Sequence, residues 1–153
     1  MVERAIVLDS GPIGLITNPK LSSYGIACNQ WLQTHLNVGN RVIIPEIANY
    51  EVRRELLRAN KQKGLARLDS LCRRLEYLPL TTAAMRQAAA LWAQARQQGQ
   101  PTAGDKTIDG DMILIAQAQT LAGSSMVIAT TNVGHLSRFI AAEEWRNIVA
   151  YPS

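Results

Sequence analysis

The sequence of 153 residues contains little cysteine and no long apolar run. Its two cysteines, Cys28 and Cys72, lie far apart and form no C-x-x-C motif, which argues against a disulfide framework and a thiolate metal site. No run of about twenty apolar residues occurs, so we expect no membrane span. The first residues lack the charged-then-apolar layout of a signal peptide. A reducing cytoplasm is therefore the expected location.

Several motifs of nucleotide binding and covalent catalysis are also absent. Gly11 and Gly14 do not make the G-x-G-x-x-G loop of dinucleotide-binding proteins, and no G-x-x-x-x-G-K-[ST] phosphate loop occurs. The chain has two histidines, His35 and His135, and no G-x-S-x-G motif, so a serine nucleophile at Ser10 has little support. A phosphatase with an aspartate nucleophile would carry a second Asp at position 11, which is glycine here.

The composition that remains is typical of one globular domain. Apolar residues make up 47% of the chain and charged residues 18%, and the length suffices for a core without disulfides or a structural metal. Short apolar runs alternate with longer helix-like segments, which predicts an α/β protein with a parallel sheet between helices. The expected strands cover 5–8, 42–44, 77–80, 126–129 and 148–151, the expected helices 22–37, 46–60, 62–75, 82–98 and 110–122, and a loop 98–107.

Acidic and polar side chains recur where these strands end. Ligands of a parallel α/β sheet bind beyond the carboxyl ends of its strands, so these positions are informative. Four separate segments contribute to this edge. They supply Asp9 after the first strand, Glu46 and Glu51 after the second, Asp109 and Asp111 beyond the loop, and Thr130, Thr131 and Asn132 after the fourth strand.

Each acid also has an ordinary structural explanation. Asp9 can cap a turn or a helix, and Asp109 and Asp111 can be the N-cap and a first-turn acid of the helix that follows. Glu51 lies in a helix interior, where no cap is needed, about 100° around the helix from the buried Val52. A glutamate at such a boundary is often ion-paired or extended to solvent. Taken singly, the acids do not establish catalysis.

Taken together, three or four carboxylates at one sheet edge need a positive charge. Without one they repel each other and raise each other's pKa. An all-oxygen ligand set without cysteine or paired histidine favours Mg²⁺ or Mn²⁺. One or two such ions can activate water and stabilise charge on a phosphodiester, which is how many nucleases work. The acids therefore favour metal-dependent phosphodiester hydrolysis.

Positive charge is concentrated directly after Glu51. The net charge is +4, and eight of the sixteen Lys and Arg residues lie between Arg53 and Arg74. Such a stretch can hold a nucleic-acid backbone, although charged faces of surface helices are also common. Beside the acids, it favours a nucleic acid as the substrate. The expected phosphate contacts are Arg53, Arg54, Arg58, Lys61 and Lys63.

Four motifs resemble, in order and spacing, those of the PIN-domain nucleases, in particular the toxins of VapBC-type toxin-antitoxin pairs. They read "IVLDSGPI", "PEIANYEVRRELLR", "IDGDMILIAQAQ" and "VIATTNVGHL" and run from about residue 5 to residue 140. The resemblance implies a single PIN-like domain over 1–153, built as a three-layer α/β/α sandwich. It also implies cleavage of RNA with Mg²⁺ or Mn²⁺, a homodimer, and inhibition by a cognate antitoxin.

The same resemblance assigns roles to individual residues. It implies that Asp9, Glu51 and Asp111 bind the metal and act in catalysis, with Asp109 as an additional catalytic acid. A small hydroxyl residue beside the first acid, here Ser10, is implied to orient that acid or a water. The residues implied to support the ligands are Ser10, Thr130, Thr131, Asn132 and His135.

One departure from the family pattern concerns the last motif. His135 stands where the family often has a fourth acid. A neutral imidazole there can bind a water or a metal, or serve only the loop structure. A chain lacking this acid can also be a PIN-like module that binds RNA or a protein and cuts weakly. We keep this alternative beside the ribonuclease, and rank a purely structural α/β protein below both.

Overall fold

A computed structural model of the chain describes residues 4–20, 22–98, 105–121, 125–134 and 136–150, with 105–108 described by their backbone alone. The strands are β1 (Arg4–Leu8), β2 (Arg41–Pro45), β3 (Glu76–Leu78), β4 (Ser125–Thr130) and β5 (Ala142–Glu144). They form one sheet in the order β3-β2-β1-β4-β5, and every pairing is parallel. The predicted parallel sheet is confirmed.

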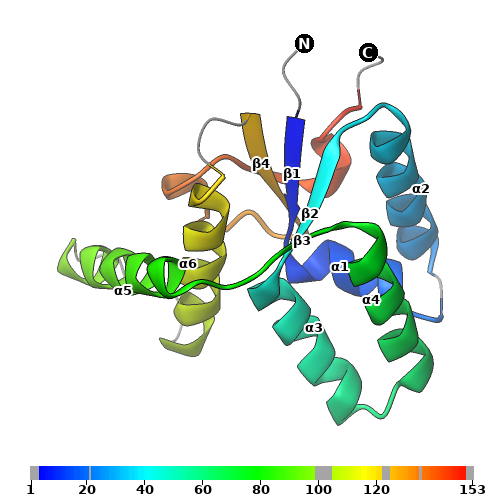
Figure 1. Cartoon of the computed structure of the whole chain (residues 1–153), viewed down its shortest axis with the longest axis horizontal. Coiled ribbons are helices and arrows are strands. Elements are labelled where there is room, and N and C mark those ends of the chain that lie inside the picture. Colours follow the sequence, from blue (N-terminus) through cyan, green and yellow to red (C-terminus); the bar gives the residue numbers. More distant parts are fainter. Residues whose placement is uncertain (1–3, 21, 99–104, 122–124, 135, 151–153) are drawn as a thin grey trace.

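Helices cover both faces of this sheet. They are α1 (Ser10–Thr17), α2 (Ser23–Asn37), α3 (Glu46–Arg58), α4 (Gln62–Arg74), α5 (Thr82–Gln97) and α6 (Asp105–Gln119). Figure 1 shows α1 to α4 on one side and α5 and α6 on the other, so the predicted three-layer α/β/α sandwich is confirmed. Within the described ranges, none of the helices combines the length and apolar character needed to cross a membrane.

The core lies in two layers, one on each face of the sheet. Successive side chains of a strand point to opposite faces. Ile6 and Leu8 of β1 accordingly pack against α1 to α4, whereas Val7 packs against α5 and α6. In β4, Val127 belongs to the first layer and Ile128 to the second. Because both faces are covered, the strands read as continuous apolar runs, which is why their positions were predictable.

The short helix α1 was not predicted, because Gly11, Pro12 and Gly14 disfavour helix in general. Its position explains why they are tolerated. Asp9 is the N-cap, and its side chain accepts a hydrogen bond from the Ser10 amide. Pro12 is the third residue of the helix, where the backbone N–H has no partner within the helix, so the missing donor costs little.

The helix α6 begins earlier than predicted. It starts at Asp105, so the prediction of a loop over 98–107 is wrong for its last three residues; 99–104 lie outside the described residues. Asp109 and Asp111 are therefore interior residues of α6, and the alternative in which they cap its N-terminus is wrong. Their orientation is set by the phase of the helix and not by capping.

The predicted strand at 148–151 is wrong, and the fifth strand is β5. Residues 148–150 follow a 3₁₀ turn, Trp145–Asn147, and position 151 lies outside the described residues. The carbonyl oxygen of Ile148 accepts hydrogen bonds from Trp31 Nε1, at 3.0 Å, and from His35 Nε2, at 2.9 Å. The apolar side chain of Ile148 is buried against α2. Its backbone thus finds partners in side chains of α2 and not in the sheet.

Candidate active site

Two polar side chains fix the start of α3 at the end of β2. Glu46 Oε1 accepts a hydrogen bond of 2.6 Å from the Leu80 amide. Gln117, only 1% exposed, accepts from the Ile47 amide at 3.1 Å and donates to the Leu78 carbonyl at 2.9 Å. Glu46 joins α3 to the segment after β3, and Gln117 of α6 bridges the start of α3 and the last residue of β3. Glu46 is thereby a structural anchor, and Gln117 is a positioning residue whose only sequence signal was an amide inside an apolar helical run.

Asp9 lies at the carboxyl end of β1, beside the end of β4. Its Oδ1 accepts from the Ser10 amide at 2.7 Å, and its Oδ2 accepts from Thr130 Oγ1 at 2.8 Å. Thr130 is 1% exposed, and its hydroxyl oxygen also accepts from the Asn132 amide at 3.1 Å. These bonds fix the carboxylate in one orientation. The capping role of Asp9 and a role at the sheet edge are thus compatible.

Glu51 projects from α3 toward the same edge. Burial, together with the negative charges of Asp9 and Asp111, raises the pKa of its carboxyl group to about 7, while Arg54 opposes the shift. The helix α6 approaches it closely, since a Cβ added at Gly110 would stand 3.0 Å from Glu51 Oε2. The structure therefore brings the acids of β1, α3 and α6 into electrostatic contact. A cation at this edge would relieve their repulsion.

The acids at this edge form an incomplete set of ligands for a divalent ion. Among the described side chains, no three carboxylate, imidazole or thiolate groups lie close enough to surround one ion. Mg²⁺ does not require such a cage, because it keeps several waters and is usually held by one or two carboxylates. Asp9, Glu51 and Asp111 offer carboxylate oxygen atoms only, which are the ligands that Mg²⁺ and Mn²⁺ prefer. The residues thus fit such an ion as partial ligands.

The other predicted site residues are distributed unevenly. Ser10 and Thr131 line a cleft with Glu51, and a Cβ at Gly11 would overlap Thr131, so glycine is needed for this close approach. Asn132 is exposed beyond Thr130. Asp109 lies apart from the three acids, in a shallow apolar cavity between α5 and α6. His135 lies outside the described residues.

The cleft has a volume of about 640 Å³ and runs between α1 and α3. Glu51 lies at one end, and three of the predicted phosphate contacts, Arg54, Arg58 and Lys61, line it further along α3. Arg54 stacks over the exposed Tyr50 ring at 5.4 Å. Acidic and basic groups therefore share one cleft, as cleavage of a polyanion would require.

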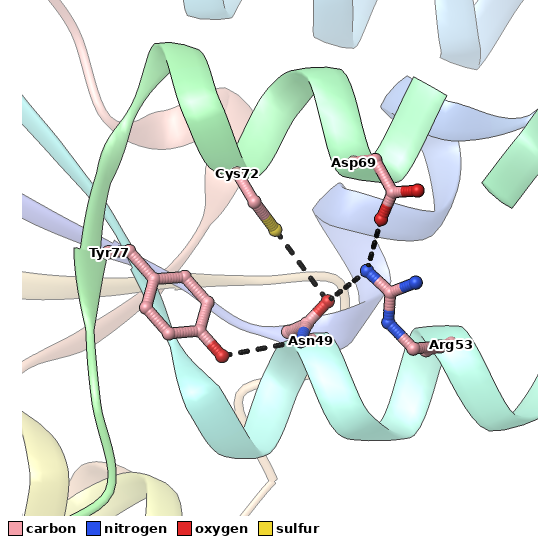
Figure 2. Close-up of polar contacts among 5 residues, drawn as sticks. All are labelled: Asn49, Arg53, Asp69, Cys72 and Tyr77. Atoms are coloured by element: carbon pink, nitrogen blue, oxygen red, sulfur yellow. Dashed lines mark hydrogen bonds and ion pairs between the residues drawn. The ribbon is translucent and has the colours of Figure 1, made fainter. Parts of the chain in front are cut away.

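Arg53 takes a different course, although it is adjacent to Arg54. Figure 2 shows its guanidinium turned toward α4, where Nη2 contacts Asp69 Oδ1 at 2.7 Å and Asn49 Oδ1 at 3.3 Å. It does not line the cleft. Lys63 lies in a smaller cavity next to the cleft. The predicted basic stretch therefore splits into a cleft-facing part and a part used in helix packing.

Solved structures share this architecture over almost the whole chain. FitAcB from Neisseria gonorrhoeae has a TM-score of 0.67 and 21% identity, covering 94% of this chain and 99% of that one. DNA-bound VapBC from Salmonella typhimurium gives 0.65 and 21%, covering 95% and 99%. VapC20 from Mycobacterium tuberculosis, a sarcin-ricin loop cleaving toxin, gives 0.62 and 13%, covering 97% and 99%. The chain has the PIN-like fold.

The PIN-like fold rests on structure alone. No family model matches the sequence, and no curated protein matches it either. Identities of 13% and 21% to the solved structures leave few residues in common. The architecture implied by four short motifs is nevertheless confirmed.

Proposed function

We propose that the protein is a metal-dependent endoribonuclease that hydrolyses RNA phosphodiester bonds. The observation that carries this proposal is the half-buried Glu51 carboxyl group, flanked by Asp9 and Asp111, in a cleft that Arg54, Arg58 and Lys61 also line. The PIN-like fold adds support, because one structural neighbour, VapC20, is an RNA-cleaving toxin. A structural role alone does not explain why three acids converge where a cationic cleft ends.

The side chains divide the work by their position. Arg54, Arg58 and Lys61 hold backbone phosphates and draw the RNA along α3 toward the acids. Thr130 keeps the Asp9 carboxylate oriented through its hydrogen bond of 2.8 Å. In the proposed site Asp9, Glu51 and Asp111 hold Mg²⁺ or Mn²⁺. The chemistry that such an ion supplies when bound is polarisation of a phosphodiester oxygen and neutralisation of developing charge.

A cognate antitoxin protein is the proposed partner. Several solved neighbours are complexes named VapBC, including DNA-bound forms from Rickettsia felis and Salmonella typhimurium. A partner that covers the cleft would keep RNA away from the acids and so restrain the proposed activity. The homodimer stays a prediction, to be checked by the mass of the purified protein in light scattering.

The proposal is tested with purified wild-type protein, Asp9→Asn and the matched control Asp69→Asn. Asp69 contacts Arg53 on the far side of α3, so its substitution removes the same charge outside the cleft. We expect Mn²⁺-dependent cleavage of a mixed RNA pool by wild type and control, and none by Asp9→Asn. Calorimetric titration of Mn²⁺ should show binding to the same two proteins only.

Two results separate the alternatives. Full metal-dependent cleavage by Asp9→Asn would refute the assignment of the site. RNA binding by the wild type without any cleavage would favour the alternative of a PIN-like binding module.

A further inference from the structure

A second, smaller cavity continues the cleft at the end remote from the acids. Its volume is about 290 Å³, and it lies between the segment after α1 and the α3–α4 turn. Asn18 and Lys61 line both cavities, so the two are adjacent. We call this second cavity the lysine notch. Its lining residues are Asn18, Pro19, Lys20, Lys61, Gln62 and Lys63.

The lysines of the notch have no acidic partner among the described residues. Each is exposed, and the ion pairs of the described chain involve other residues. Arg58, by contrast, is paired with Glu55 at 2.8 Å. Lys20, Lys61 and Lys63 therefore place three uncompensated positive charges around one small cavity. Their mutual repulsion favours an anion between them.

The backbone around the notch is held in place on both sides. The Asn18 side chain accepts a hydrogen bond from the Lys20 amide at 3.1 Å, and the Asn18 carbonyl accepts one from Arg67 at 3.4 Å. Across the notch, the Lys61 amide donates to the Leu56 carbonyl at 2.9 Å. The lysines are thus presented from fixed turns, so that little backbone ordering is needed when a ligand binds.

We propose that the lysine notch is a second RNA subsite, which binds a backbone phosphate between its ammonium groups and a nucleobase against Pro19. The lining is predominantly apolar apart from the lysine ends, as a base face requires. A base can enter only when it is unstacked and unpaired. The inference rests on the proposed function, since it extends the RNA path beyond the residues assigned to cleavage.

The distance between the two subsites sets the length of RNA that can use both. Glu51 and Arg58, the last residue of α3, are seven residues apart, which corresponds to about 10 Å at 1.5 Å per residue, and Lys61 lies in the turn beyond Arg58. At about 3.4 Å per stacked nucleotide, this is a span of about three nucleotides. An RNA shorter than that cannot occupy the acids and the lysine notch together.

The test measures RNA binding in the Asp9→Asn background, in which cleavage is expected to be absent and the probe stays intact. The variant is Lys20→Ala/Lys63→Ala, and the matched control is Arg73→Ala/Arg74→Ala, which removes two exposed charges at the other end of α4. Lys61 is left in place because it also lines the main cleft. The probes are fluorescent oligouridylates of about two and about twelve nucleotides, one shorter and one longer than the span above.

With the longer RNA, the lysine variant should bind more weakly than the control. The salt slope is the change in the logarithm of the affinity with the logarithm of the salt concentration. Loss of two phosphate contacts lowers its magnitude by about 1.4. Between 50 and 200 mM salt, the affinity of the variant should therefore fall about sevenfold less than that of the control. The two-nucleotide RNA should show less than about a twofold difference, because it cannot bridge both subsites.

Three results would overturn the inference. Equal binding of the longer RNA by variant and control would remove the lysine notch as a subsite, while leaving the proposed nuclease intact. If the protein bound a polyglutamate peptide as tightly as the longer RNA, the lysine notch would be a general anion site for acidic protein segments. Absence of RNA binding by every protein, the parent included, would refute the proposed function and the subsite together.

Discussion

The two sides of helix α3 carry similar residues and have opposite roles. On one side, Arg54 lines the cleft with Glu51. On the other, Arg53 and Asn49 are used in packing against α4 (Figure 2). Arg53 and Arg54 differ by one position, or about 100° around the helix. The phase of the helix, and not the number of charges, therefore decides which arginine is available to a ligand.

The packing side is a connected polar network. Asn49 Oδ1 accepts from Arg53 and, at 3.6 Å, from the Cys72 thiol, while Asn49 Nδ2 donates to Tyr77 Oη at 3.3 Å. Asp69 completes the set through its contact with Arg53. On this side the polar groups of these five residues bond to one another. On the cleft side Arg54 takes part in none of the ion pairs of the described residues, and four predictions separate the two sides.

The largest effect is expected from Glu51→Gln on the cleft side. The change keeps the size of the side chain and removes its negative charge. Mutation of residues that only support the ligands of a metal site lowers activity by about 10- to 100-fold. For Glu51→Gln we therefore expect RNA cleavage to fall by at least about 100-fold. Single-turnover kinetics with saturating Mn²⁺ measure this. Cleavage within about threefold of wild type would exclude Glu51 from the site.

The corresponding change on the packing side is Asn49→Ala. It leaves the partners of Asn49 with fewer hydrogen bonds, at a cost of about 1–3 kcal/mol in the free energy of unfolding. Urea denaturation measures the loss. Cleavage per folded molecule should stay near the wild-type value, and a large fall in activity at full stability would contradict the division between the two sides.

Glu51 also predicts how stability depends on pH in the absence of divalent metal. Its pKa is raised from 4.5 to about 7 in the folded protein, so folding favours the protonated form. The stabilisation is complete below about pH 4.5 and is lost as the pH rises through about 7. Between about pH 5 and pH 8, wild type should lose about 1–2 kcal/mol relative to Glu51→Gln. If the free energies of unfolding of wild type and Glu51→Gln, measured by urea denaturation, changed with pH in parallel, the raised pKa of this carboxyl group would be contradicted.

The smallest effects distinguish Arg53→Ala from Arg54→Ala. Arg54→Ala should lower the salt slope of RNA binding by about 0.7, the value for one phosphate contact on a single strand. Arg53→Ala should leave that slope unchanged. The Arg53–Asp69 pair is 33% and 49% exposed, so its loss should lower stability by less than about 1 kcal/mol. Equal slopes for the two variants would place both arginines on the same surface.

Continuous apolar strands made most of the fold predictable from the sequence. The strands β1, β2 and β4 are buried on both faces and stood out as runs such as "AIVL". The short edge strand β5 has the sequence AEE and offers no such signal. The helix α1 was hidden by glycine and proline, whose cost disappears only once Asp9 is known to cap the first turn.

The candidate site was predictable in its residue types and less so in its geometry. Asp9, Glu51 and Asp111 were identified by their place after strands and in a motif, and the structure brings them into electrostatic contact. Asp109 lies two positions from Asp111, about 200° around α6, and therefore faces α5. Lys20 had no signal, because its nearness to Lys63 depends on how α1 and α4 pack.

The hydrogen bond between Thr130 and Asp9 joins residues 121 positions apart. The sheet edge that carries the site is complete only when β4 has docked beside β1, which is the partner of β2 from the first third of the chain. Such distant pairing forms late and slowly. During synthesis, a ribosome-bound chain that ends before β4 has Asp9 without its orienting hydroxyl. The proposed nuclease is thus inactive until most of its own chain has been made.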